Sequence, residues 1–207
     1  KLFKTSLLAL ALASVTSIVN ADTLAITHAT IHTATEQGIL TDATVVIENG
    51  KISAIHTSSE RVNELKTDNV FDAQGKILTP GLIGSMNKLG LVEVSAVSRT
   101  QDAGDKKAGI TFDASIAFNP RTTVIAYSRK GGITTNIVAP KGGDSMFKGQ
   151  AFIANLSGDL SSIVESQTAV IVDLGAKSKG SRALELQKLR YKFEDAQKAI
   201  AKAKEKS

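Results

Sequence analysis

The first part of the chain alternates apolar and polar positions in the manner of β-strands. Residues 23–28 show this period of two, and residues 45–48 repeat it. An Asn-Gly pair at residues 49–50 then favours a two-residue hairpin, because both central residues must take a positive φ. A further turn is expected at residues 73–76. The pattern therefore predicts a small antiparallel β-sandwich layer in residues 22–78.

From residue 79 to residue 207 the pattern changes to mixed strand and helix. An Asn-Pro pair at residues 119–120 resembles an N-cap followed by proline, and a Gly-Gly pair at residues 131–132 is typical of a helix end. Residues 121–130 are therefore predicted to form a short helix, and residues 133–138 a strand. Alternation of strand and helix indicates an α/β architecture.

Two later segments have equally clear patterns. The continuous apolar run at residues 169–172 is typical of a strand that is buried on both faces of a parallel sheet. Near the end of the chain, apolar residues recur at intervals of three and four and predict a helix that packs on a sheet, with Glu194 and Lys198 paired across one turn. The stripe consists of Leu186, Leu189, Phe193, Ala196, Ile200 and Ala203.

The amino terminus has the features of a secretory signal. Two lysines precede the apolar run of residues 7–13, and small residues end at Ala21. A membrane anchor is the alternative, but the uncharged run of residues 5–21 is marginal for a bilayer core about 30 Å thick. We expect cleavage after Ala21, which makes residues 1–21 a signal peptide. The chain has no cysteine for lipid attachment, so the mature protein is expected to be soluble and either secreted or periplasmic.

Composition excludes several kinds of chemistry. The absence of cysteine removes disulfide scaffolds, thiolate-bound zinc and thiol nucleophiles. The net charge of +5 does not indicate nucleic acid, because residues 177–207 hold ten basic and four acidic side chains, whereas residues 22–176 hold thirteen basic and sixteen acidic ones. The basic segment is interpreted as one solvated helix face, and no nucleic-acid partner is expected.

Residues 72–83 read Asp-Ala-Gln-Gly-Lys-Ile-Leu-Thr-Pro-Gly-Leu-Ile. This stretch resembles the beginning of the catalytic barrel of the amidohydrolase superfamily, particularly of its imidazolonepropionase-like branch. The hairpin at residues 48–52 is similar to the β-sandwich that flanks this barrel. The glycine-rich segments at residues 131–134 and 140–150 are similar to its second unit. The resemblance implies a (β/α)8 barrel of the TIM type and hydrolysis of amide or cyclic amide C–N bonds by a metal-activated water.

The same resemblance exposes a degenerate metal motif. In the family, two histidines separated by one residue at the end of the first barrel strand bind a divalent metal such as zinc. Here Met86 and Lys88 occupy these two positions, and Gly84 occupies the position of a family aspartate. A thioether is a weak zinc ligand and an ammonium group has no lone pair. Either the protein is a non-metallated relative, with Lys88 supplying a positive charge, or it binds a metal through other ligands.

Length adds a second departure, because a complete barrel of this type takes about 250 residues. Residues 79–207 are enough for three strand–helix units and a partial barrel. The chain is therefore expected to be an amino-terminal fragment that is inactive by itself. We expect an exported amidohydrolase-like protein with a small-molecule amide substrate. The alternative is a catalytically silent relative that binds a ligand or a partner through the same loops.

Four residues are candidates for contact with a substrate. Asp144, Ser145 and Gln150 belong to a loop that lines the active-site mouth in the resembled fold. Glu93 is predicted to lie in an apolar strand, residues 91–94, near that mouth. Glu93 is either a general acid or base or a solvent-facing side chain.

The three histidines are not predicted to bind metal. His28 and His32 lie four residues apart, but in a strand this spacing separates them by roughly 13 Å. His56 is isolated in the sequence. We interpret all three as structural or exposed histidines.

Overall fold

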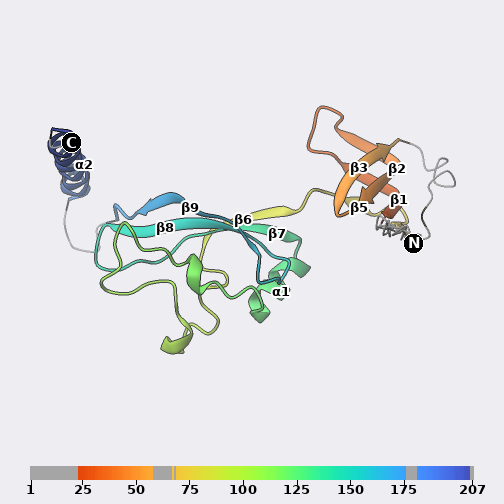
Figure 1. Ribbon diagram of the computed structural model, residues 1–207. Helices are drawn as coiled ribbons and strands as arrows, with labels where there is room; N and C mark the ends of the chain where they lie inside the picture. The colour runs from red at the N-terminus through yellow and green to blue at the C-terminus, as the bar shows by residue number, and fades with distance from the viewer. Residues whose placement is uncertain (1–22, 58–66, 68, 176–180, 206–207) are drawn as a thin grey trace, which may run out of the picture. The chain divides into compact units, whose positions relative to one another are not determined.

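The computed structural model describes residues 23–57, 67, 69–175 and 181–205. The predicted signal peptide at residues 1–21 lies outside these residues. The backbone divides into two compact units, Lys1–Pro80 and Gly81–Ser207, and Figure 1 labels their strands and helices.

The first unit is a sheet with the strand order β3-β2-β1-β4, and β5 also pairs with β1. Antiparallel pairs join β1 to β2 and β2 to β3, whereas β4 and β5 both run parallel to β1. The predicted antiparallel layer is therefore confirmed for β1, β2 and β3, but it does not describe β4 and β5. Strand β4 pairs with Ala25, Ile26 and Thr27 at the beginning of β1 and runs in the same direction. The strands are β1 (Thr23–His32), β2 (Ile39–Glu48), β3 (Lys51–His56), β4 (Val70–Asp72) and β5 (Ile77–Leu78).

Both predicted turns of the first unit are confirmed. Asn49 and Gly50 have φ values of 52° and 74°, and Glu48 pairs with Lys51 across the hairpin. Gln74 and Gly75 likewise have φ values of 52° and 77° between β4 and β5. Positive φ at both central residues gives the turn a twist that matches the flanking strands.

The core of the first unit lies between β1, β2 and the turn after β4. Burial follows the period of two along β1, where Ala25, Thr27, Ala29 and Ile31 are buried. The apolar cluster consists of Ala29, Ile31, Ala43, Val45 and Ala73.

The second unit contains a sheet with the strand order β6-β7-β8-β9. Strands β6 and β7 are parallel with α1 between them, whereas β8 is antiparallel to both β7 and β9. The expected series of three strand–helix units is thus limited, among the described residues, to β6-α1-β7. The connection at residues 139–146 is too short for a parallel crossover, so β8 returns antiparallel. The elements are β6 (Leu82–Asn87), α1 (Thr123–Lys130), β7 (Ile133–Val138), β8 (Phe147–Asn155) and β9 (Ile163–Val172).

Helix α1 begins two residues later than predicted. Its N-cap is Thr122, whose hydroxyl accepts a hydrogen bond from the amide of Val124 at 3.4 Å. The side chain of Asn119 instead accepts a hydrogen bond from the amide of Arg121 at 3.0 Å and stabilises the turn before the helix. The predicted end is confirmed, because Gly131 is the C-cap and Gly132 has a φ of 86°.

Residues 169–172 form a strand, as predicted, but they are not buried on both faces. They form the end of β9, an outer strand of the sheet with β8 as its partner. Val170 is 43% exposed and Val172 is 36% exposed. An antiparallel outer strand needs no apolar cover on both faces, so apolar content alone did not determine its place.

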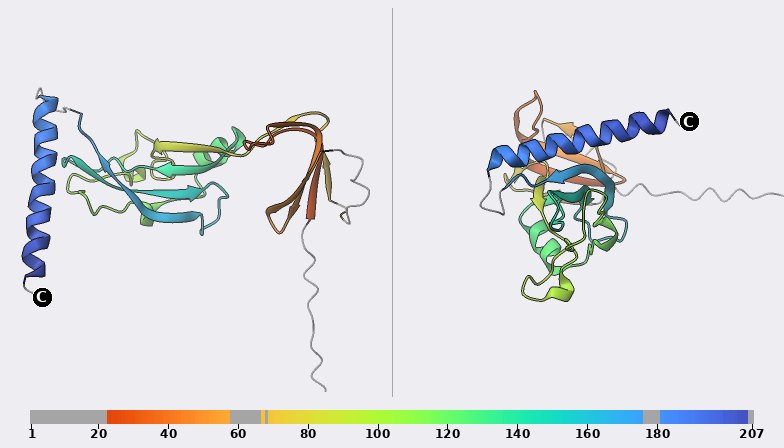
Figure 2. Two further views of the ribbon diagram at one scale, coloured as in Figure 1. Left: turned by 90° about the horizontal axis from the view of Figure 1, so that it is seen from above. Right: turned by 90° about the vertical axis from the view of Figure 1, so that its left-hand side faces the viewer.

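The predicted last helix is present as α2 (Arg182–Lys204), and Figure 2 shows it as one continuous helix. Ser181 caps it by accepting a hydrogen bond from the amide of Ala183 at 3.2 Å. Its apolar stripe is not packed on a sheet, since none of its residues is buried among the described residues. Glu194 pairs with Arg190 at 3.0 Å rather than with the predicted Lys198.

The core of the second unit lies between the sheet and the long segment that joins β6 to α1. Figure 1 shows this segment, in yellow-green to green, along one side of the sheet. It contains two short 3-10 helices, η2 (Ser98–Thr100) and η3 (Ser115–Ala117). Phe152 of β8 is fully buried, and its ring meets that of Phe118 edge-on with centroids 5.6 Å apart. The buried cluster consists of Leu91, Ala103, Ala114, Val138, Phe152 and Ala154.

Candidate functional site

A pocket of about 330 Å³ lies where β6 and β7 end. Lys88 follows β6 directly and residues 141–144 follow β7. The lining is completed by Val92, Gln101 and residues 103–106. In α/β folds the carboxyl ends of parallel strands are the usual place for a ligand. We therefore take this pocket as the candidate functional site and call it the strand-end pocket.

Two glycines let the pocket walls meet at the level of the backbone. A Cβ atom on Gly104 would lie 2.2 Å from the carbonyl oxygen of Gly142, and one on Gly143 would lie 2.3 Å from the carbonyl oxygen of Asp105. The amide of Lys141 donates a hydrogen bond to the carbonyl of Ala103 at 2.7 Å. The two walls are thus joined by backbone contacts that a larger side chain would disrupt.

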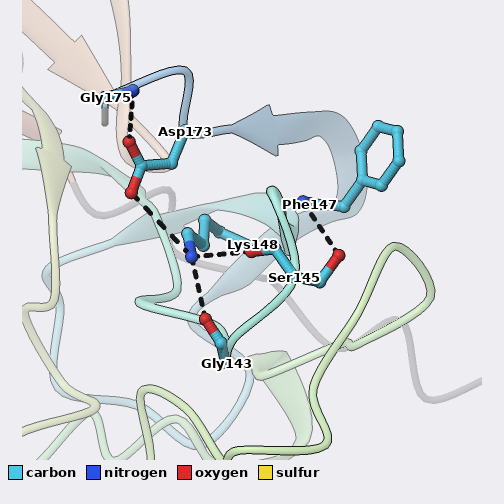
Figure 3. A network of polar contacts seen from close by, with 6 residues as sticks. All are labelled: Gly143, Ser145, Phe147, Lys148, Asp173 and Gly175. Atoms are coloured by element: carbon cyan, nitrogen blue, oxygen red, sulfur yellow. Dashed lines mark hydrogen bonds and ion pairs between the residues drawn. The ribbon is translucent and has the colours of Figure 1, made fainter. Parts of the chain in front are cut away.

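A buried lysine fixes one of these walls (Figure 3). Lys148 of β8 is 5% exposed, and its ammonium group donates hydrogen bonds to the carbonyls of Gly143 at 2.8 Å and Ser145 at 2.7 Å. The same nitrogen lies 3.8 Å from a carboxylate oxygen of Asp173, which follows β9. A buried charge needs such partners, so Lys148 connects the loop after β7 to the end of β9. Lys148 is a residue that the sequence pattern did not reveal.

A pair of amide side chains fixes the end of β6. Asn87 and Asn136 exchange two hydrogen bonds, each 2.9 Å long, and Asn136 is fully buried. A Cβ atom on Gly84 would lie 2.4 Å from the side-chain oxygen of Asn136. Gly84 therefore leaves the space that this amide occupies, where the resembled family has an aspartate. Asn136 is a residue type that is uncommon within strands, and its place in β7 was the available signal for this contact.

The residues at the family's metal positions do not fit a zinc ion. Met86 is 63% exposed with a φ of 55°, and its thioether is a poor ligand for zinc. Lys88 carries an ammonium group, which offers no lone pair. Among the described residues, no cluster of three or more His, Asp or Glu side chains has the arrangement of a metal site. We therefore derive no chemistry through a metal at this place.

The structure brings one of the four predicted contact residues to the strand-end pocket. Asp144 lines it, whereas Ser145 lies farther along the loop, where its hydroxyl accepts a hydrogen bond from the amide of Phe147 at 3.1 Å. Gln150 lies within β8 and donates a side-chain hydrogen bond to the carbonyl of Ile110 at 3.3 Å.

The apolar neighbours of Glu93 predicted a strand, but Glu93 does not lie in one. It follows a single bridge between Val92 and Gln101, and it is exposed. Its carboxylate accepts a hydrogen bond from the side chain of Asn119. In this structure Glu93 therefore joins the loop after β6 to the turn before α1.

Three lysines give the strand-end pocket its charge. Lys88, Lys106 and Lys141 come from different segments, and none has an ion-pair or hydrogen-bond partner for its ammonium group among the described residues. Asp105 and Asp144 also line the pocket. One carboxylate oxygen of Asp105 accepts a hydrogen bond from the amide of Lys107 at 2.8 Å.

One carboxylate of the second unit, outside the lining of the strand-end pocket, has a perturbed pKa. Asp113 accepts hydrogen bonds from the amide of Ser115 at 2.9 Å and from the side chain of Gln167 at 3.1 Å. Hydrogen bonding to Ser115 is the main cause that holds the pKa of Asp113 below its ordinary value of 3.8, and partial burial opposes it. The charge of Asp113 thus ties η3 to β9.

The histidines lie outside the strand-end pocket. His28 and His32 are both in β1 of the first unit, as their strand-like surroundings predicted. The Nδ1 atom of His28 lies 3.2 Å from a carboxylate oxygen of Asp72. His28 therefore has a contact between neighbouring strands, which agrees with a structural role.

No family model matches the sequence, and no curated protein matches it. Among solved structures, the chain is similar to an amidohydrolase from Thermotoga maritima MSB8, with a TM-score of 0.71 and 20% sequence identity. The match covers 87% of this chain and 49% of that chain, so this chain spans about half the length of that neighbour. At this identity the likeness establishes a shared fold and nothing further.

Within the ranges that the structure describes, no helix combines the length and the apolar character required to span a bilayer.

Proposed function

We propose that this chain is an amidohydrolase-like protein that binds a small amide-containing molecule in the strand-end pocket and does not hydrolyse it. The observation that carries the proposal is the chemistry of the pocket itself. It lies at the carboxyl ends of β6 and β7, as a ligand site of this fold does, but Lys88 stands in it at a position where the resembled family has a metal-binding histidine. The residues present offer hydrogen bonds and positive charge rather than a metal-activated water.

The branch of the superfamily and the type of barrel are also part of this proposal. The sequence at residues 72–83 resembles the imidazolonepropionase-like branch, and β6-α1-β7 corresponds to the first units of a (β/α)8 barrel. The likeness to an amidohydrolase fold supports the second statement, and the branch rests on the sequence resemblance alone. Gly84, Met86 and Lys88 are then the degenerate form of the family's metal motif.

Export is proposed on the sequence alone. The basic start, the apolar run at residues 7–13 and the small residues ending at Ala21 support a signal peptide that is cleaved after Ala21. The bound molecule would then be met in the periplasm or outside the cell.

Hydrolysis of C–N bonds is the second candidate function, and the fold likeness favours it. Because this chain spans about half of the structural neighbour, such an activity belongs to the proposal for a longer protein of this kind. It would need metal ligands outside the positions of Met86 and Lys88.

The test combines binding and turnover on the whole chain. A dipeptide, a hydantoin and a lactam are each incubated with the protein, with and without added zinc, and both the bound fraction and the products are followed by NMR. We expect saturable binding of at least one compound, no product, and less than stoichiometric zinc by elemental analysis. Zinc-dependent product formation would overturn the proposal and support the second candidate.

A matched pair of variants places the binding. Gln101 lines the strand-end pocket, whereas the neighbouring Arg99 is exposed and does not. Gln101→Trp is expected to fill the pocket and abolish binding, and Arg99→Trp is expected to leave it unchanged. Equal binding by both variants would show that the ligand does not bind in this pocket.

A further inference from the structure

The positive charge of the strand-end pocket comes from three lysines that are far apart in the sequence. Its three lysines come from the end of β6, from the loop before η3 and from the loop after β7, so their convergence is a product of the fold. None of the three ammonium groups is engaged by another described residue. Like charges on the wall of one pocket repel one another, and a bound anion relieves that repulsion.

The two aspartates of the pocket do not remove this charge. Asp105 already accepts a hydrogen bond from the amide of Lys107, and neither Asp105 nor Asp144 lies within ion-pair distance of Lys88, Lys106 or Lys141 among the described residues. Three cations and two anions leave the lining with a net positive charge.

The remaining lining distinguishes between anions. It has no arginine and no helix N-terminus, which are two of the features by which proteins bind phosphate. Half-buried Val92 and buried Ala103 add an apolar wall beside the lysines. A small organic acid fits this combination, because its carboxylate meets the ammonium groups and its carbon skeleton meets the apolar wall.

We infer that the strand-end pocket recognises a carboxylate, held by Lys88, Lys106 and Lys141, on the molecule that the protein binds. This inference rests on the proposed function, since it takes the same pocket as the ligand site. It narrows the ligand to an amide that also carries a carboxylate, such as an N-acyl amino acid. Lys88 then binds the anion of the ligand at a position where the resembled family has a metal-binding histidine.

Chemical acetylation of the whole chain tests this placement. Lysine modification is followed by mass spectrometry without ligand, with N-acetyl-L-alanine, and with the uncharged N-acetyl-L-alanine amide. The acid is expected to slow acetylation of Lys88, Lys106 and Lys141 several-fold, and the amide is not. Lys51 and Lys130 are exposed and do not line the pocket, so their rates are expected to stay constant.

Variants give a second readout. Lys141→Gln is expected to weaken binding of N-acetyl-L-alanine roughly tenfold, as the loss of one charged hydrogen bond does, and Lys130→Gln is expected to have no effect. The effect of Lys141→Gln is expected to shrink at high salt.

The outcomes separate this inference from the proposed function. If the acid and the amide protect the same lysines equally, or if neither protects any, the carboxylate assignment is wrong. Zinc-dependent hydrolysis with the lysines still protected by the acid alone would overturn the proposed function and leave the carboxylate site in place.

Discussion

The strand β1 of the first sheet and the outer strand β6 of the second sheet are held in place in different ways. In the first unit, β1 has partners on both sides, and its buried side chains alternate as a half-buried strand requires. In the second unit, the outer strand β6 carries no buried side chain, and Leu82 and Ile83 are 58% and 68% exposed. Specific polar contacts, rather than apolar packing, fix the end of β6. The candidate site therefore depends on a few hydrogen bonds that strand β1 does not need.

The largest expected contrast comes from truncating one isoleucine in each sheet. Ile31 is 4% exposed in the first unit, and Ile31→Ala is expected to lower the free energy of unfolding of that unit by about 3 kcal/mol. Ile83→Ala in β6 is expected to change stability by less than about 0.5 kcal/mol. Amide hydrogen exchange, which reports on each unit separately, measures both effects. Equal costs would contradict the difference between the two strands.

Removal of the buried cation is the next largest effect. Lys148→Met leaves the carbonyls of Gly143 and Ser145 without their donor, and is expected to destabilise the second unit by roughly 2–3 kcal/mol. Exchange protection in the loop after β7 is expected to fall first. Lys130→Met, at an exposed position, is the control. If the two variants are equally stable, the network in Figure 3 does not hold the pocket wall.

Loss of the amide pair at the end of β6 is expected to lower the free energy of unfolding somewhat less. Asn136→Ala removes both hydrogen bonds to Asn87, and a loss of about 2 kcal/mol is expected. A double-mutant cycle with Asn87→Ala gives the coupling between the two side chains, which is expected to be on the order of 1 kcal/mol. Additive effects in urea unfolding would show that the pair is not coupled.

The smallest effect concerns pH. The pKa of Asp113 is lower in the folded chain than its ordinary value of 3.8, so its contribution is complete above that value and is lost as the pH falls through the folded pKa. Asp113→Asn is expected to reduce stability by about 1 kcal/mol at pH 7 and to reduce the loss of stability below pH ~4. Unfolding midpoints of both proteins between pH 2 and 7 test this, and parallel pH profiles would contradict it.

Local signals predicted much of the backbone correctly. The hairpin at Asn49-Gly50 and the end of α1 at Gly131 were predictable, because the residues that permit positive φ are few and their effect is confined to neighbours. The strand at residues 133–138 was also predictable, since it is rich in β-branched residues and follows the clear turn at residues 131–132.

Long-range contacts were not predictable in this way. Asn87 and Asn136 lie in two different strands, and although an asparagine within a strand is itself a signal, neither segment indicates which side chain is its partner. Lys148 has the appearance of an ordinary strand lysine, and only the fold places Gly143, Ser145 and Asp173 around it. The direction of β8 follows from the length of the loop at residues 139–146. That length was unknown from the sequence, because β8 itself had not been predicted as a strand. The sequence likewise did not indicate that Lys88, Lys106 and Lys141 line one pocket, because they come from three different segments.

The central claim is that the strand-end pocket binds an organic anion through lysines and without a metal. Isothermal titration of the whole chain with N-acetyl-L-alanine in the presence of a metal chelator tests it most directly. The account predicts saturable binding of one molecule per chain, with the same affinity after zinc is added in excess over the chelator. Binding that appears only when zinc is present, or heat that never saturates, would contradict it.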